Sequence, residues 1–82
     1  NPFNSTVEIN FALHRQSDVN IDIYDAAGRL VDQAVNGRLN AGIHAVNWEG
    51  KNQPTGIYFA RLSFDNKQSS VHNRMLKLLL VR

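Results

Sequence analysis

Two strand-like runs joined by a turn-rich segment most constrain how this chain can fold. Residues 44–48 and 56–64 each alternate between apolar and other side chains at a period of two, which is typical of half-buried strands. The side chains that share the inward face are His44, Val46 and Trp48 in the first run, and Tyr58, Ala60, Leu62 and Phe64 in the second. The segment between the runs contains turn-forming residues: Gly50, Asn52, Pro54 and Gly56. The pattern predicts two strands joined by a chain reversal.

Two aromatic residues give this stretch a structural role. Trp48 is the only tryptophan, and its indole offers the largest single apolar surface for a core. Tyr58 falls just inside the start of its strand. In immunoglobulin-like sandwiches, a tyrosine at such a place turns its hydroxyl back onto the backbone of the preceding connection. We therefore interpret residues 46–62 as the stretch that holds a small all-β sandwich together.

Two further strands precede this stretch. Their inward residues are Val7, Ile9, Phe11 and Leu13 in the first, and Val19, Ile21 and Ile23 in the second. Asp25-Ala26-Ala27-Gly28 predicts a turn in which Gly28 adopts a positive φ. Residues 29–35 fit either a short helix or a strand, and we favour a strand because every neighbouring element is β. Asn36-Gly37 predicts a tight turn, and Asn40-Ala41-Gly42 a second break.

The last expected strand, residues 71–81, is apolar on both faces towards its end. Such a run indicates either a strand covered on both sides or an exposed strand that awaits a partner. Residues 67–82 also carry four basic residues and no acidic one. This basic end fits an acidic partner or anionic lipid headgroups, and equally fits basic residues that protect an apolar strand from aggregation.

Turn signals about every ten residues predict an immunoglobulin- or fibronectin type III-like antiparallel sandwich of six or seven strands. The 82 residues suit one domain spanning 1–82. With no cysteine, the domain depends on packing and has no thiolate ligand or nucleophile. Because the chain opens with Asn1 and not with Met, we expect it to be a fragment of a longer precursor.

Nothing in the sequence indicates catalysis, a cofactor or a metal. His14, His44 and His72 are too widely spaced to form a metal site that is readable from sequence. No serine lies in a G-x-S-x-G context, and the glycines are scattered at turns. The basic end lacks interleaved aromatics, which argues against nucleic-acid binding. Carbohydrate binding stays open as an alternative, through a stacking platform drawn from Tyr24, Trp48, Tyr58 and Phe59.

Several sequence blocks together resemble one family. In chain order they are Asn1-Pro2-Phe3-Asn4, residues 23–31 (IYDAAGRLV), Ala41-Gly42-Ile43-His44, Trp48-Glu49-Gly50, residues 55–62 (TGIYFARL) and Met75-Leu76-Lys77-Leu78. In this order the blocks resemble the C-terminal sorting domain (type A) of type IX-secreted bacterial proteins. The Tyr-Asp-x-x-Gly and Trp-x-Gly blocks are also similar to the immunoglobulin-like domain of the flagellar hook-capping protein, which would imply a structural scaffold role.

The sorting-domain resemblance implies a non-catalytic domain at the C-terminus of a secreted protein. It implies that the domain directs its N-terminal cargo through the periplasm and across the outer membrane to the medium or cell surface. The implied partners are an outer-membrane translocon, a shuttle protein and a surface signal peptidase. Attachment of the cargo to anionic lipopolysaccharide usually follows cleavage in this family.

Two sets of residues follow from these interpretations. We expect the last strand to contact the partner by adding to its sheet, through Met75, Lys77, Leu79, Val81 and Arg82. The competing hypothesis makes residues 75–81 a central core strand. The residues that we assign to folding are Asp25, Gly28, Trp48, Gly56 and Tyr58.

Overall fold

The computed structural model describes residues 6–50, 52–65 and 72–81, and this part of the chain is built from strands. The strands in chain order are β1 (Thr6–Leu13), β2 (Ser17–Asp25), β3 (Leu30–Leu39), β4 (Gly42–Glu49), β5 (Gly56–Asp65) and β6 (His72–Leu80). All of their pairings are antiparallel. The leader residues 1–4 and Arg82 lie outside the described residues.

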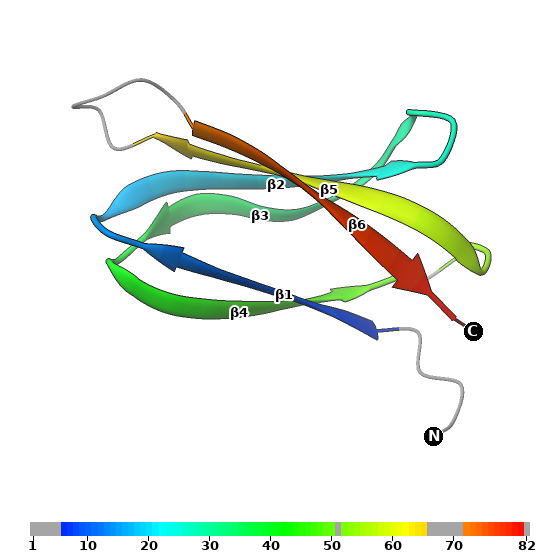
Figure 1. Cartoon of the computed structure of the whole chain (residues 1–82), viewed down its shortest axis with the longest axis horizontal. Helices are drawn as coiled ribbons and strands as arrows, with labels where there is room; N and C mark the ends of the chain where they lie inside the picture. The colour runs from blue at the N-terminus through cyan, green and yellow to red at the C-terminus, as the bar shows by residue number, and fades with distance from the viewer. Residues whose placement is uncertain (1–5, 51, 66–71, 82) are drawn as a thin grey trace.

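The six strands form two sheets that face each other (Figure 1). β1 pairs with β4 in one sheet, and the other has the strand order β3-β2-β5-β6. This arrangement confirms the expected antiparallel sandwich, with six strands in the described part. It also resolves the ambiguity at residues 29–35, because β3 pairs with β2 as a strand.

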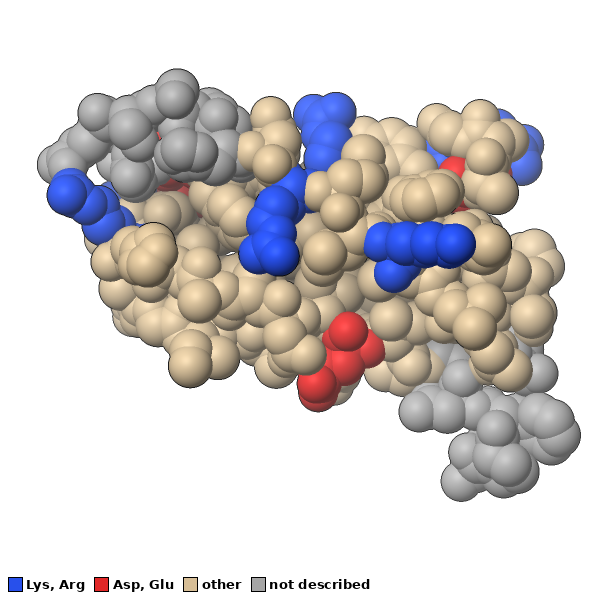
Figure 2. All heavy atoms as spheres, in the orientation of Figure 1, with Lys and Arg blue, Asp and Glu red and all other residues tan. Residues whose placement is uncertain are grey.

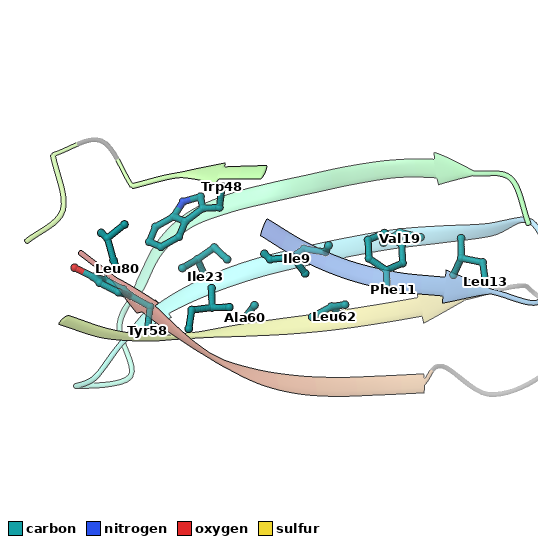
Figure 3. Close-up of a cluster of buried hydrophobic side chains, with 12 residues drawn as sticks. Ile9, Phe11, Leu13, Val19, Ile23, Trp48, Tyr58, Ala60, Leu62 and Leu80 are labelled. Carbon is teal, nitrogen blue, oxygen red and sulfur yellow. The ribbon is translucent and has the colours of Figure 1, made fainter. Parts of the chain in front are cut away.

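The core lies between the two sheets and is built from the alternating side chains (Figure 3). Its buried members are Ile9, Phe11, Leu13, Val19, Ile21, Ile23, Trp48, Tyr58, Ala60, Leu62, Leu78 and Leu80. Because alternate side chains of a strand point to opposite faces, each strand sends one set inward and leaves the other outside. The apolar inward residues predicted for β1, β2, β4 and β5 are the ones that pack in or against this core, and His44 of β4 stacks on the buried Phe11.

The predicted turn at Asn36-Gly37 is wrong. Both residues lie inside β3, where Asn36 pairs with Asn20 and Gly37 pairs with Val19. The regular pairing of residues 35–39 with residues 17–21 of β2 outweighs the local turn preference, since it satisfies the backbone hydrogen-bonding groups of this part of β3. The chain reverses instead between Leu39 and Gly42, where Gly42 has a φ of 134°.

β6 lies at the edge of the four-stranded sheet and pairs with β5 alone among the described strands. The hypothesis of a central core strand is therefore wrong. One face of β6 is nevertheless part of the core, because Leu78 and Leu80 are buried. Its apolarity on both faces thus has two origins: one face packs inward, and the other is exposed.

Candidate interaction surface

The outer face of β6 and Val81, which follows its last residue, carry four of the five residues expected to contact a partner. Met75, Leu79 and Val81 are 57%, 64% and 47% exposed, and Lys77 is exposed between them. They follow the period of two that places side chains on one face of a strand. The fifth, Arg82, lies outside the described residues.

β5 extends this apolar surface across the sheet. Ile57 is 40% exposed and pairs with Leu79 on β6. Among the described residues, six large hydrophobic side chains are exposed, and four of them belong to this face: Ile57, Met75, Leu79 and Val81. We call these four residues the outer apolar stripe. Single exposed apolar side chains are common on protein surfaces, but clusters of them are not. A cluster at the edge of a sheet is typical of an interaction site.

Basic side chains border the outer apolar stripe. Lys77 pairs in register with Phe59, and Arg61 pairs with Met75. Among the described residues, no ion pair joins Lys77 or Arg61 to a carboxylate. Figure 2 shows that the face on which β6 lies in front displays more basic than acidic side chains.

A hollow of about 510 Å³ lies on the outer face beside this stripe. Tyr24, Phe59 and Met75 supply its apolar lining from three neighbouring strands, and Arg61 supplies a cation. Asp25 at the end of β2, and Ala26 and Gly28 in the turn after it, complete the lining. The arrangement combines an aromatic surface with an available positive charge, as in sites that bind apolar groups close to an anion.

The residues lining this hollow were missed as a group by sequence reasoning. The alternation in β5 already placed Phe59 and Arg61 opposite the inward Tyr58, Ala60 and Leu62. The missing information was the register, which sets Tyr24 of β2 directly beside Phe59. Of the four aromatic residues considered for stacking on a carbohydrate, Trp48 and Tyr58 are buried in the core. Only Tyr24 and Phe59 of the four lie on the outer face.

Tyr58 fixes the connection that precedes its own strand. Its hydroxyl donates a hydrogen bond of 2.6 Å to the carbonyl oxygen of Pro54, which confirms the expected contact. Its ring meets the indole of Trp48 edge-on, with the centroids 5.2 Å apart. This pair closes one end of the core, where Leu80 of β6 also packs (Figure 3).

Trp48 also joins the two sheets through its polar atom. The indole Nε1–H donates a hydrogen bond of 2.8 Å to Oδ2 of Asp32. Trp48 belongs to β4 and Asp32 to β3, which lie in different sheets. The bond satisfies the one donor that a buried indole must place.

Asp25 organises the turn after β2. Its Oδ1 accepts hydrogen bonds from the backbone N–H groups of Ala27 and Arg29, and its Oδ2 accepts one from Arg29 Nε. Gly28 has a φ of 86°, as predicted for this turn. The backbone N–H of Arg29, aided by the Arg29 side chain and the Ala27 N–H, lowers the pKa of Asp25 below its ordinary value of 3.8.

Gly50 and Gly56, which flank the connection between β4 and β5, have different surroundings. Gly50 is buried against Leu80, and a Cβ atom there would lie 2.5 Å from Leu80 Cδ2. Gly56 begins β5 and has open space around it. In this connection the residue with a positive φ is Asn52, at 64°.

The described residues hold no group of three or more side chains arranged to bind a metal ion. His14 lies exposed between β1 and β2, whereas His44 stacks on Phe11 and its Nε2 lies 2.7 Å from the carbonyl oxygen of Asn40. The side chain of His72 is outside the described part. Within that part, no helix has the length and apolarity to cross a membrane.

A comparison with known families gives a match that covers nearly the whole chain. Residues 1–77 match the model of the secretion system C-terminal sorting domain. No curated protein and no solved structure shows significant similarity to the chain. The expected relation to the hook-capping domain stays a prediction. The matched span includes both sheets and most of β6, and the chain belongs to the family of secretion system C-terminal sorting domains, which act as sorting signals for the type IX pathway.

Proposed function

We propose that this domain is a non-catalytic address that directs an attached cargo protein across the outer membrane by the type IX pathway. The family match over residues 1–77 supports this function. In this proposal the domain forms the C-terminal part of a longer secreted protein, and the cargo lies on its N-terminal side. The cargo passes through the periplasm and ends in the medium or on the cell surface.

The outer apolar stripe is the observation that carries the proposal. Leu79 is 64% exposed and lies on a strand that has one neighbour in its sheet. Natural sheets usually avoid such an edge because it invites unwanted pairing with other chains. A partner that covers this edge during secretion would explain why β6 keeps exposed apolar side chains.

The proposed mode of recognition is strand addition. A strand of the partner pairs with the free edge of β6 through backbone hydrogen bonds, which supply affinity without regard to sequence. Met75, Lys77 and Leu79 then lie beside alternate side chains of the added strand and select them.

The outer-membrane translocon and the shuttle protein are the proposed partners. A surface signal peptidase then removes the domain, and the cargo becomes attached to anionic lipopolysaccharide.

An export assay tests the proposal. The 82 residues are fused behind a fluorescent protein with an ordinary export signal, in a host with the type IX pathway. We expect fluorescence at the surface or in the medium, and its loss in a translocon mutant. Fluorescence retained in the periplasm, with the domain folded, would refute the address function and favour carbohydrate binding or a scaffold role.

A further inference from the structure

We propose that the hollow beside the outer apolar stripe receives a bulky apolar side chain from an acidic, extended segment of the partner protein. This inference deepens the proposed sorting function and rests on it. It assigns a role to Tyr24, Phe59 and Arg61, and it gives the chemistry of the segment that would pair with β6.

The register of the sheet builds the hollow. Tyr24 of β2 lies opposite Phe59 of β5, and Phe59 lies opposite Lys77 of β6. In the adjacent row, Arg61 of β5 lies opposite Met75 of β6. Two aromatic rings and one thioether therefore line a volume of about 510 Å³ that opens on the outer face. Met side chains adapt readily to the shape of an apolar or aromatic partner.

A partner strand at the edge of β6 has access to this hollow. Met75 forms its β6 side. A residue directly opposite Met75 on an added strand would place its Cβ about 4.5–5.5 Å from that of Met75, and long or aromatic side chains reach further across a sheet. A bulky apolar side chain at this position would pack on Met75 and enter the hollow.

The charges around the hollow favour an acidic segment. The carboxylate of Asp25 is already engaged by Arg29 and by two backbone N–H groups. Asp22, the neighbour of Arg61 on β2, keeps its charge but directs Oδ1 to Gln33, and no ion pair joins it to Arg61. No ion pair among the described residues engages Arg61 or Lys77. Two cations thus flank an apolar surface, and charge complementarity selects carboxylates beside the inserted side chain.

An extended peptide fits this surface better than a lipid headgroup does. The edge of β6 offers backbone donors and acceptors in a row, which a strand can pair with and a headgroup cannot. Anionic headgroups would require the cations alone, and they would leave the aromatic rings of Tyr24 and Phe59 without a function. Binding of an acidic peptide should therefore depend on Phe59, whereas binding of an anionic lipid headgroup should not.

The test uses a short acetylated and amidated peptide as its probe. The peptide contains glutamate, threonine, tryptophan, threonine and glutamate in that order. In an extended strand, the tryptophan and the two glutamates therefore point to the same face. Binding to the isotope-labelled 82-residue chain is followed by NMR titration. We expect shifts at Tyr24, Phe59 and Met75 and along β6. Control peptides carry alanine for the tryptophan, or lysines for the glutamates, and both should bind more weakly.

Variants of the chain sharpen the test. Phe59→Ala should weaken binding about tenfold or more, which is common for the loss of an aromatic anchor. Met75→Ser, on a largely exposed residue, is the second variant in case Phe59→Ala unfolds the domain. Arg61→Glu should weaken binding of the glutamate peptide and improve binding of the lysine peptide. Ile43→Ala is the matched control, because Ile43 is an exposed hydrophobic residue in the other sheet and should leave affinity unchanged.

Three results would overturn the inference. The first is that the glutamate peptide leaves the NMR resonances of Tyr24, Phe59 and Met75 unshifted. The second is that Arg61→Glu does not change the preference of the chain between the glutamate and lysine peptides. The third is binding to vesicles of phosphatidylcholine and phosphatidylglycerol that depends on Arg61 and Lys77 but not on Phe59. The export assay separates this failure from failure of the sorting function. If the wild-type fusion is exported and the folded Phe59→Ala fusion is exported equally, sorting stands and the hollow has no role.

Discussion

Gly50 and Leu80 occupy adjoining space at one end of the core. A Cβ atom at Gly50 would lie 2.5 Å from Leu80 Cδ2 and 2.9 Å from Leu80 Cδ1. Gly50 follows β4, and Leu80 is the last residue of β6, so this contact joins the segment after β4 to the end of β6. The glycine of the Trp48-Glu49-Gly50 block therefore serves a close approach between two segments.

Gly50→Ala should destabilise the domain by about 1–3 kcal/mol, because the added methyl group overpacks the site against Leu80. The cost should fall when Leu80→Ala is combined with it, since the shorter side chain leaves room for the methyl group. Urea denaturation of the two single variants and the double variant measures this coupling. Equal costs of Gly50→Ala in both backgrounds would contradict the assigned contact.

Tyr58→Phe should destabilise the domain by about 1 kcal/mol, because it removes the hydrogen bond to Pro54 and leaves the ring in place. Tyr24→Phe is the matched control, since no hydrogen bond from the Tyr24 hydroxyl is found among the described residues. It should leave the free energy of unfolding unchanged. If both variants lose the same stability, the effect does not come from the Pro54 contact.

The turn at Asp25 predicts a dependence of stability on pH. The pKa of Asp25 is lower in the folded chain than its ordinary value of 3.8, so the carboxylate stabilises the folded state above that value. This contribution should decline as the pH falls below 3.8 and through the folded pKa. The difference in melting temperature between the wild type and Asp25→Asn should therefore shrink on acidification from neutral pH. A difference that is constant down to strongly acidic pH would show that ionised Asp25 does not stabilise the turn.

Truncation should separate the two faces of β6. Ending the chain after Leu80 removes Arg82 and the exposed Val81, and should change stability by less than about 0.5 kcal/mol. Ending it after Leu79 also removes the fully buried Leu80, and should cost about 2–5 kcal/mol. Thermal melts of both chains check this. Similar losses for both would mean that Val81 and Arg82 also stabilise the fold, and truncation would then be unsuitable for testing recognition.

Much of the fold was predictable from alternation and turn chemistry. β1 and β2 each turn towards the core the apolar set that the sequence pattern indicates, and Gly28 adopts the positive φ that its turn requires. The hydroxyl contact of Tyr58 followed from its place at the start of β5. These features depend on residues near each other in the chain, so local physical rules are enough to predict them.

The features that were missed depend on pairing between distant segments. Asn36-Gly37 is a strong local turn signal, but β2 pairs along it and keeps it extended. The hollow needs Tyr24 and Phe59 to be neighbours, and a shift of the register by one residue would send one of them to the other face. For β6, apolarity on both faces could not distinguish an edge strand from a central one. Only the strand order separates these cases.

Export of the fusion with a polar outer stripe tests the central claim most directly. Met75→Ser, Leu79→Ser and Val81→Ser are combined, which changes exposed side chains and leaves the buried Leu78 and Leu80 in place. The matched control is Ile43→Ser, on the exposed Ile43 of the other sheet. We predict that the triple variant melts like the wild type and is retained in the periplasm, while the control is exported. Normal export of the folded triple variant would contradict recognition through the outer face of β6.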